Sequence, residues 1–240
     1  RDYGELLRAD INSFIPAFIS EYESETGETD TQLMDRWNAL SGTLDERIVS
    51  EIEGIAETSR IELSMLQMAH AAAIYGGGAL WNSAATMAYG QLLADDSEAA
   101  HAVTVNSALG LDLAEKYLCA ILYIPNKGAP HTVFTYAGLA VGYTGINLGG
   151  ISASECPDPA SSAAEGNALP LMRSMLYDAF SLRSAIDMVE ASTPFNTSLV
   201  LGDARNEMRG ARVRTNDVGL LPLRYDLVED LAGDTPGIVF

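Results

Sequence analysis

The sequence predicts an α+β fold in which two antiparallel β-sheets pack face to face and helices lie outside them. Apolar residues recur at helical spacing through residues 1–75 and again through 169–192. Short runs of β-branched and small residues, divided by turn-forming residues, lie between these segments and return at 197–215. The chain of 240 residues is 48% hydrophobic, which suffices for a large core, and we expect a single domain over 1–240.

The N-terminal third is expected to be almost wholly helical. Residues 5–24 place apolar side chains on one face of a helix and charges on the other. After a polar turn, residues 33–40 continue the pattern, and residues 44–74 give two further helical segments that separate near 58–60.

Strands follow the helices. Residues 84–93 and 101–109 predict a hairpin, because the ADDSEAA segment between them is rich in turn-forming residues. An antiparallel sheet of at least five strands is completed by runs at 118–125, 131–138 and a pair around the turn at 147–150. Asn147 suits the backbone of such a turn, so we interpret it as structural.

The C-terminal part returns to helices and then to strands. Two helices are predicted over 169–180 and 181–192, with Ser181 as the N-cap of the second. Strands resume at 197–204 and 210–215. This order of elements suits two packed sheets with outer helices, and no internal repeat competes with it.

Charge excludes several classes of partner. The formal net charge of -19 would repel a nucleic-acid backbone or an anionic membrane, so we expect neither as a partner. The apolar runs are too short or too broken by glycine to span a bilayer, and no signal sequence is recognisable. We expect a soluble protein whose upstream residues are missing or removed, because the chain begins at Arg1 without methionine or leader. Localisation stays unassigned.

Cysteine and histidine give no metal site. Cys119 and Cys156 are too few for a disulfide framework and lack the paired spacing of a zinc site, so packing roles are expected. His70, His101 and His131 are scattered, with no acidic residue at ligand spacing, and we interpret all three as structural. We predict no metal and no cofactor.

Several stretches share their order and spacing with one known family. Ser50–Gln67, SEIEGIAETSRIELSMLQ, is followed at the family's spacing by the strand Ala85–Leu92, ATMAYGQL. A proline-glycine turn, a glycine-rich segment and paired helices follow at Pro125–Gly128, Gly138–Ile151 and Leu169–Ala191. These stretches resemble the acyl-coenzyme A:6-aminopenicillanic acid acyltransferase group, the peptidase C45-like family of N-terminal-nucleophile (Ntn) hydrolases. The resemblance covers residues 3–210 and implies a four-layer αββα sandwich. The chain stops earlier than the family's usual end.

The resemblance also implies an autocatalytic activity. Members are precursors that cut their own chain before a cysteine, whose freed α-amine then serves as the base for its thiol. That cysteine position falls on Ala85, and the cleavage point follows Ala84. Alanine cannot attack a carbonyl, so we expect an uncut, inactive variant. Its segments 1–84 and 85–240 would remain associated after cleavage.

The implied parent activity is that of an amidase or acyltransferase on N-acyl amide or acyl-thioester substrates. Two explanations of Ala85 stay open: a cysteine replaced deliberately to trap the precursor, which the intact neighbouring pattern favours, or natural loss of activity. A non-catalytic protein that binds an acylated small molecule or peptide is the alternative function. A shifted alignment would make Ser83 the nucleophile, and Cys156 is a further candidate.

Other site residues are also carried over from the resemblance. Asn106 matches an asparagine that precedes the family's catalytic aspartate, but the aspartate position falls on Ala108, unless Asp112 substitutes. Asn216 is matched to an oxyanion-binding asparagine. The substrate pocket is expected to involve Thr86, Tyr89, Ser154 and Glu155.

Overall fold

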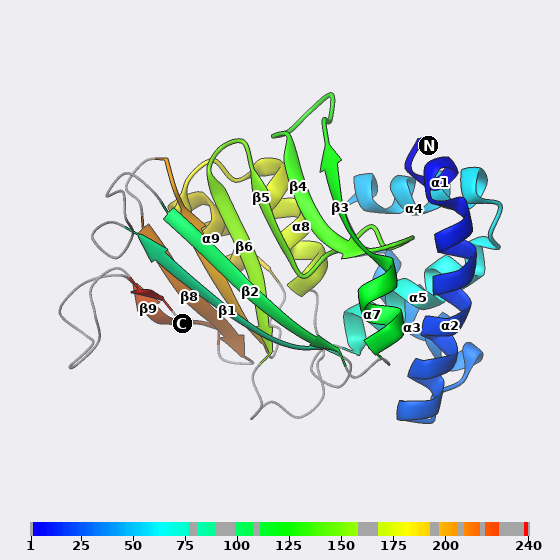
Figure 1. Ribbon diagram of the computed structural model, residues 1–240. Helices are drawn as coiled ribbons and strands as arrows, with labels where there is room; N and C mark the ends of the chain where they lie inside the picture. The colour runs from blue at the N-terminus through cyan, green and yellow to red at the C-terminus, as the bar shows by residue number, and fades with distance from the viewer. Residues whose placement is uncertain are drawn as a thin grey trace.

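The computed structural model packs two antiparallel sheets face to face, with a helical layer behind the larger sheet and an N-terminal helical bundle at one end (Figure 1). It describes residues 2–76, 81–89, 99–107, 111–157, 168–192, 197–205, 209–216, 219–225 and 238–239. These elements confirm the predicted α+β sandwich of two antiparallel sheets with helices outside them.

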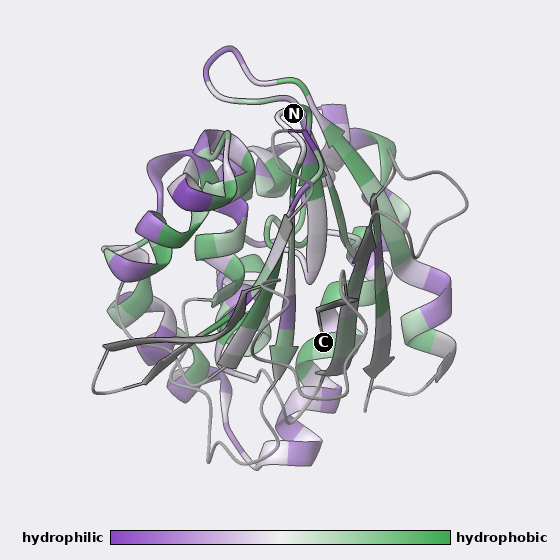
Figure 2. Ribbon diagram, turned by 90° about the vertical axis from the view of Figure 1, so that its left-hand side faces the viewer, coloured by the Kyte–Doolittle hydropathy of each residue, from purple (hydrophilic) through white to green (hydrophobic). Residues whose placement is uncertain are grey.

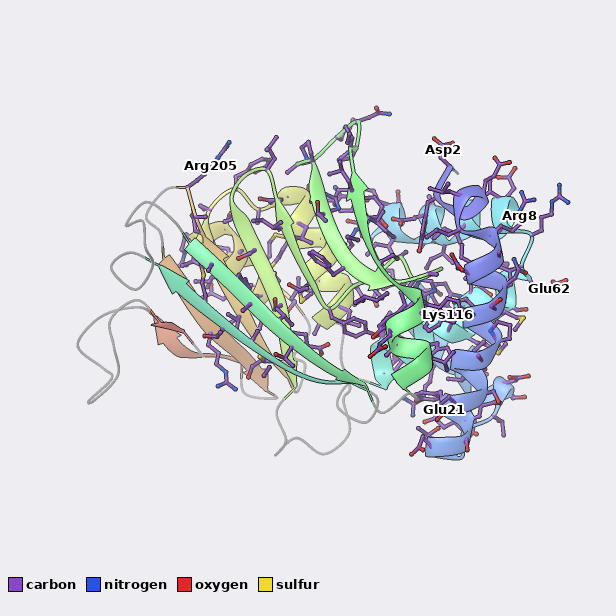
Figure 3. All side chains as sticks on the ribbon, viewed as in Figure 1. Asp2, Arg8, Glu21, Glu62, Lys116 and Arg205 are labelled. Atoms are coloured by element: carbon purple, nitrogen blue, oxygen red, sulfur yellow. The ribbon has the colours of Figure 1, made fainter. Side chains whose placement is uncertain are left out.

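The N-terminal bundle contains five helices: α1 (Asp2–Leu6), α2 (Arg8–Thr26), α3 (Asp30–Ser41), α4 (Glu46–Ser59) and α5 (Leu63–Tyr75). The break predicted near 58–60 is confirmed, because Arg60 adopts a left-handed conformation that ends α4. A capping box between Thr29 and Gln32 starts α3. The helices carry hydrophilic and hydrophobic bands (Figure 2), and Glu21 and Glu62 project outward (Figure 3).

The bundle packs against one end of the large sheet. Phe14 of α2 stacks on Tyr136, with 5.3 Å between ring centroids, and also contacts Tyr117. His70 of α5 is fully buried and accepts a hydrogen bond at Nε2 from the Ala140 N–H at 2.8 Å, while its Nδ1 lies 2.6 Å from the Leu66 carbonyl oxygen. Burial lowers the pKa of His70 to about 4, so its ring is neutral near pH 7 and fills a structural role, as predicted.

The large sheet has the strand order β3-β4-β5-β6-β7-β8-β9, and every neighbouring pair is antiparallel. Its strands are β3 (Leu118–Tyr123), β4 (His131–Tyr136), β5 (Thr144–Asn147), β6 (Ile151–Pro157), β7 (Thr197–Asp203), β8 (Arg209–Asn216) and β9 (Gly219–Tyr225). The strands predicted up to residue 215 are confirmed, whereas β9 is not predicted.

The small sheet has the order β10-β1-β2, with β1 (Trp81–Tyr89), β2 (Ala99–Ser107) and β10 (Ile238–Val239). The predicted hairpin is confirmed, with Ala85 opposite Val103. The prediction that this hairpin joins the following strands in one sheet is wrong. A helix that the sequence patterns do not predict, α7 (Leu111–Tyr117), lies between β2 and β3, and β1 packs across β6 and β7 instead of pairing with them.

Two helices cover the other face of the large sheet. Helix α8 (Ala168–Asp178) packs on β5 and β6, and α9 (Leu182–Glu190) packs on β7 and β8. Ser181 caps α9 as predicted, in a box with Ser184. Asn147 donates from Nδ2 to the carbonyls of Leu176 and Ala179 and accepts at Oδ1 from the Ile151 N–H, which confirms its structural role.

A buried ion pair joins α8 to the bundle. The Arg173 side chain is 1% exposed, and its Nη2 lies 2.7 Å from Glu51 Oε2. The guanidinium carbon is 3.5 Å from the centroid of the Tyr123 ring. Burial raises the pKa of the Glu51 carboxyl, against the opposing charge of Arg173. Helices α4 and α8 and strand β3 are therefore held together by an ion pair and a cation–π contact in addition to apolar packing.

Candidate functional site

Ala85 faces the space between the two sheets. Along β1 the exposure alternates, with Ala84 exposed and Ala85 and Met87 buried. Ala85 and Met87 pack with Cys156 and Val200 from the large sheet, next to Val103 of β2. The position predicted to be that of the nucleophile therefore points inward, whereas Ala84 points to the opposite side of the strand.

The thiol of Cys156 lies directly against this position. The Ala85 N–H donates to Cys156 Sγ at 3.0 Å, and the same sulfur is 4.0 Å from the Ala85 carbonyl oxygen. Burial raises the pKa of the Cys156 thiol, so it is protonated near neutral pH and a poor nucleophile. Its contacts give it a packing role, which agrees with the sequence prediction.

A hydrogen-bonded chain of small polar side chains crosses between the sheets beside Met87. His101 of β2 contacts two serines of β6: its Nδ1 lies 2.7 Å from Ser152 Oγ, and its Nε2 lies 2.9 Å from Ser154 Oγ. Ser154 Oγ is in turn 2.7 Å from Thr144 Oγ1. Burial lowers the pKa of His101 to about 4, so the imidazole is neutral near pH 7 and one ring nitrogen can accept a hydrogen bond.

Two cavities open beside this chain of polar groups. The first, of about 150 Å³, includes Met87, Ser152 and Gly145 in its lining. The second, of about 240 Å³, is more apolar and is lined by Val103, Leu118, Phe134, Tyr136 and Tyr143 together with His101 and Thr144. His101, Phe134 and Thr144 line both cavities, so the two form adjoining parts of one site. Ala85 is not among the lining residues of either.

The sheets approach so closely at one point that only glycine fits. A Cβ at Gly202 of β7 would lie 2.2 Å from Met87 Sδ and 2.6 Å from Ser152 Oγ.

Replacing Gly202 by alanine is expected to lower the free energy of unfolding by about 1–3 kcal/mol, because Met87 must move toward the first cavity. Chemical denaturation measures the loss. Gly42→Ala, whose new methyl group meets nothing within 4 Å, is the control, and equal stabilities of the two variants would contradict the prediction.

The predicted pocket residues lie on two faces of β6. Ser152, Ser154 and Cys156 alternate with Ala153 and Glu155, and the first three face the small sheet, as their contacts with His101 and Ala85 show. The structure thus brings Ser154 to the space between the sheets. Glu155 is buried and lies on the opposite face of the strand. Their predicted role in substrate binding stays a prediction.

Of the other predicted residues that the structure describes, all but Thr86 are placed by backbone alone. Thr86 is half-buried in β1, one residue beyond Ala85. Asn106 lies opposite Asn82 in the β1–β2 ladder, and Asn216 ends β8. The side chains of Tyr89, Asn106 and Asn216, and of the alternatives Ser83 and Asp112, lie outside the described part of the structure. For Ala108, the backbone also lies outside the described part of the structure.

His101 and Ser152 are not predicted as site residues from the sequence. The sequence holds only a weak signal: two serines two positions apart on one strand share a face, and a histidine on a strand of the facing sheet can contact them. The pairing of β1 with β2 and the crossing of β1 over β6 are what bring His101 to these serines. Nothing in the local sequence specifies that crossing.

Within the described ranges, no cluster of three or more histidine, cysteine, aspartate or glutamate side chains is placed to hold a metal ion. In the same ranges, every helix is too short or too polar to cross a membrane. Cys119 and Cys156 are both free thiols.

No family model matches the sequence, and no curated protein matches it. Among solved structures, the chain is similar to the Caenorhabditis elegans N-acylethanolamine-hydrolyzing acid amidase ortholog. The two share 13% sequence identity with a TM-score of 0.49, over 65% of this chain and 68% of that chain.

Proposed function

We propose that this chain is an amidohydrolase or acyltransferase of the Ntn type whose nucleophile position holds alanine, so that it stays uncut and inactive in that reaction. The inward-facing position of Ala85 between the two sheets carries the proposal. A side chain longer than alanine at this position would project toward β6 and β7, next to the polar groups around His101. Two adjoining cavities open beside these groups, and the apolar lining of the second suits the acyl chain of an N-acyl amide or acyl-thioester.

The proposal predicts that cysteine at position 85 restores self-cleavage. The introduced thiol would attack the carbonyl carbon of residue 84, giving a thioester and the free α-amine of residue 85, and water would then hydrolyse the thioester. Because Cys156 Sγ lies 3.0 Å from the nitrogen of residue 85, a second thiol here would be close enough to react with it. The variant is therefore made as Ala85→Cys with Cys156→Ala.

Intact mass spectrometry is expected to show this variant as two pieces, 1–84 and 85–240. Their masses should sum to that of the uncut chain plus one water. Ala84→Cys in the same Cys156→Ala background is the matched control, because its thiol would lie on the exposed side of β1. The pieces are expected to elute together, since residues 81–84 pair with residues 104–107 of β2. A variant that stays in one piece and forms no acyl-enzyme with an activated amide would refute the proposal.

A second candidate function is the binding of an acylated small molecule or peptide without chemistry. Alanine at position 85 favours it, because the space between the sheets then has cavities nearby but no side chain at that position that could attack a carbonyl. If Ala85→Cys is inert while the wild-type chain binds N-butyryl-p-nitroanilide, this second function is the one that applies.

A further inference from the structure

We propose that Ser152 is a nucleophile activated by His101, and that the unmodified chain is thereby a slow esterase for carboxylic esters with a short apolar acyl group. This inference does not depend on Ala85. It rests on the hydrogen-bonded chain between the sheets and on the two cavities beside it.

The geometry meets the first requirement of an activated hydroxyl, a base within hydrogen-bond distance. Ser152 Oγ lies 2.7 Å from His101 Nδ1. Ser152 is 6% exposed and forms part of the wall of the first cavity, so its hydroxyl borders the space in which a reagent would sit.

The second requirement is a group that fixes the ring and its tautomer. His101 Nε2 lies 2.9 Å from Ser154 Oγ, which lies 2.7 Å from Thr144 Oγ1. When Nε2 carries the proton, it donates to Ser154, Ser154 donates to Thr144, and Nδ1 is left to accept from Ser152. Ser154 and Thr144 are positioning residues in this arrangement.

The cavities decide which serine reacts. The opposite tautomer would activate Ser154, but that side chain is fully buried and does not line either cavity. Ser152 does line the first. His101 stands at the boundary of both cavities, where a carbonyl carbon near Ser152 would leave its acyl chain directed toward Phe134 and Leu118 of the second.

The reaction balances with water alone. Ser152 Oγ bonds to the ester carbonyl carbon and passes its proton to His101 Nδ1, while the bond to the leaving alcohol oxygen breaks and the alcohol takes that proton. Water then gives a proton to His101 and adds to the acyl carbon. The bond to Ser152 Oγ breaks, Ser152 recovers its proton from His101, and the carboxylic acid departs.

The test uses the wild-type chain with p-nitrophenyl butyrate and p-nitrophenyl acetate. Release of p-nitrophenol is followed by absorbance, and peptide mapping locates the acyl group. The expected result is acylation of Ser152 and turnover above buffer. Ser152→Ala is expected to lose both, whereas Cys156→Ala, on the same face of the same strand, keeps them. Acylation of any other residue, turnover that survives in folded Ser152→Ala, or no turnover by the wild type would each overturn the proposal.

The base is tested separately. His101→Ala is expected to lower turnover by about a hundredfold or more, and added imidazole is expected to restore part of it by occupying the vacated space. A purely structural histidine would give no such rescue. If folded His101→Ala reacts as fast as the wild type, His101 is not the base and the proposal fails.

Chain-length preference tests the second cavity. Leu118 is 52% exposed and lines this cavity, so Leu118→Trp is expected to fill space there without burying new charge. Turnover of the butyrate ester should fall several-fold relative to that of the acetate ester. An unchanged ratio would overturn the assignment of this cavity to the acyl chain. The Ala85→Cys result bears on none of these outcomes, because every measurement here uses alanine at position 85.

Discussion

Replacing Arg173 by methionine is expected to lower the free energy of unfolding by about 3–5 kcal/mol. The Arg173 side chain is 1% exposed and donates from Nη2 to Glu51 Oε2 at 2.7 Å and to the Tyr177 hydroxyl at 3.1 Å. Without it, the Glu51 carboxylate, whose side chain is only 15% exposed, keeps the Tyr123 hydroxyl as its one donor among the described side chains. The variant also removes the guanidinium from the face of the Tyr123 ring.

Urea denaturation of four proteins measures this effect: wild type, Arg173→Met, Glu51→Gln and the double variant. The double variant should lose less stability than the two single losses added together, because it leaves neither charge unpaired. Arg183→Met is the matched control: its side chain is 70% exposed and pairs with Asp187 on the surface of α9, so its loss should stay below about 1 kcal/mol. Equal losses for Arg173→Met and Arg183→Met would contradict the role of burial.

Acid is expected to destabilise the fold between about pH 6.5 and pH 4, with His70 as a main cause. Burial lowers the pKa of folded His70 to about 4, whereas the unfolded chain takes up the same proton near pH 6.5. Between these values the unfolded state binds more protons, so stability is fully present above pH 6.5 and is lost as the pH falls toward 4. The contribution of this single ring is about 3 kcal/mol.

The measurement compares wild type with His70→Gln at several pH values. Glutamine does not titrate, so the stability difference between the two proteins should shrink by about 3 kcal/mol from pH 7 to pH 4. Trp37→Phe is the control, because Trp37 lies against the His70 ring edge but carries no titrating proton. Its stability difference from wild type should be the same at both pH values. A His70→Gln difference that does not change with pH would contradict a buried neutral histidine.

Most helices and hairpins of this fold can be predicted from local patterns. The separation of α4 from α5, the cap at Ser181 and the β1–β2 hairpin depend on residues close together in the chain. Helix α7 and strand β9 are not predicted. Helix α7 has seven residues, fewer than the two turns that make a helical pattern recognisable.

The candidate site can be predicted only in part. The pattern around Ala85 leads to a strand position that does face the space between the sheets, and Ser154 is expected beside it. The sequence favours a structural role for His101 because no partner lies near it in the chain. Its partners Ser152 and Ser154 are more than fifty positions away.

Residues close together in the chain specify which segments become helix or strand, which of their faces are buried, and that position 85 has no nucleophile. Contacts between distant segments, in contrast, make β1 and β2 a separate sheet, carry β1 across β6 and β7, and bring His101 to Ser152 beside two cavities. The difference comes from the range of the interactions. Helical and strand periodicity arise between neighbours in the chain, whereas the choice of which faces pack together depends on the whole set of elements that must share one core.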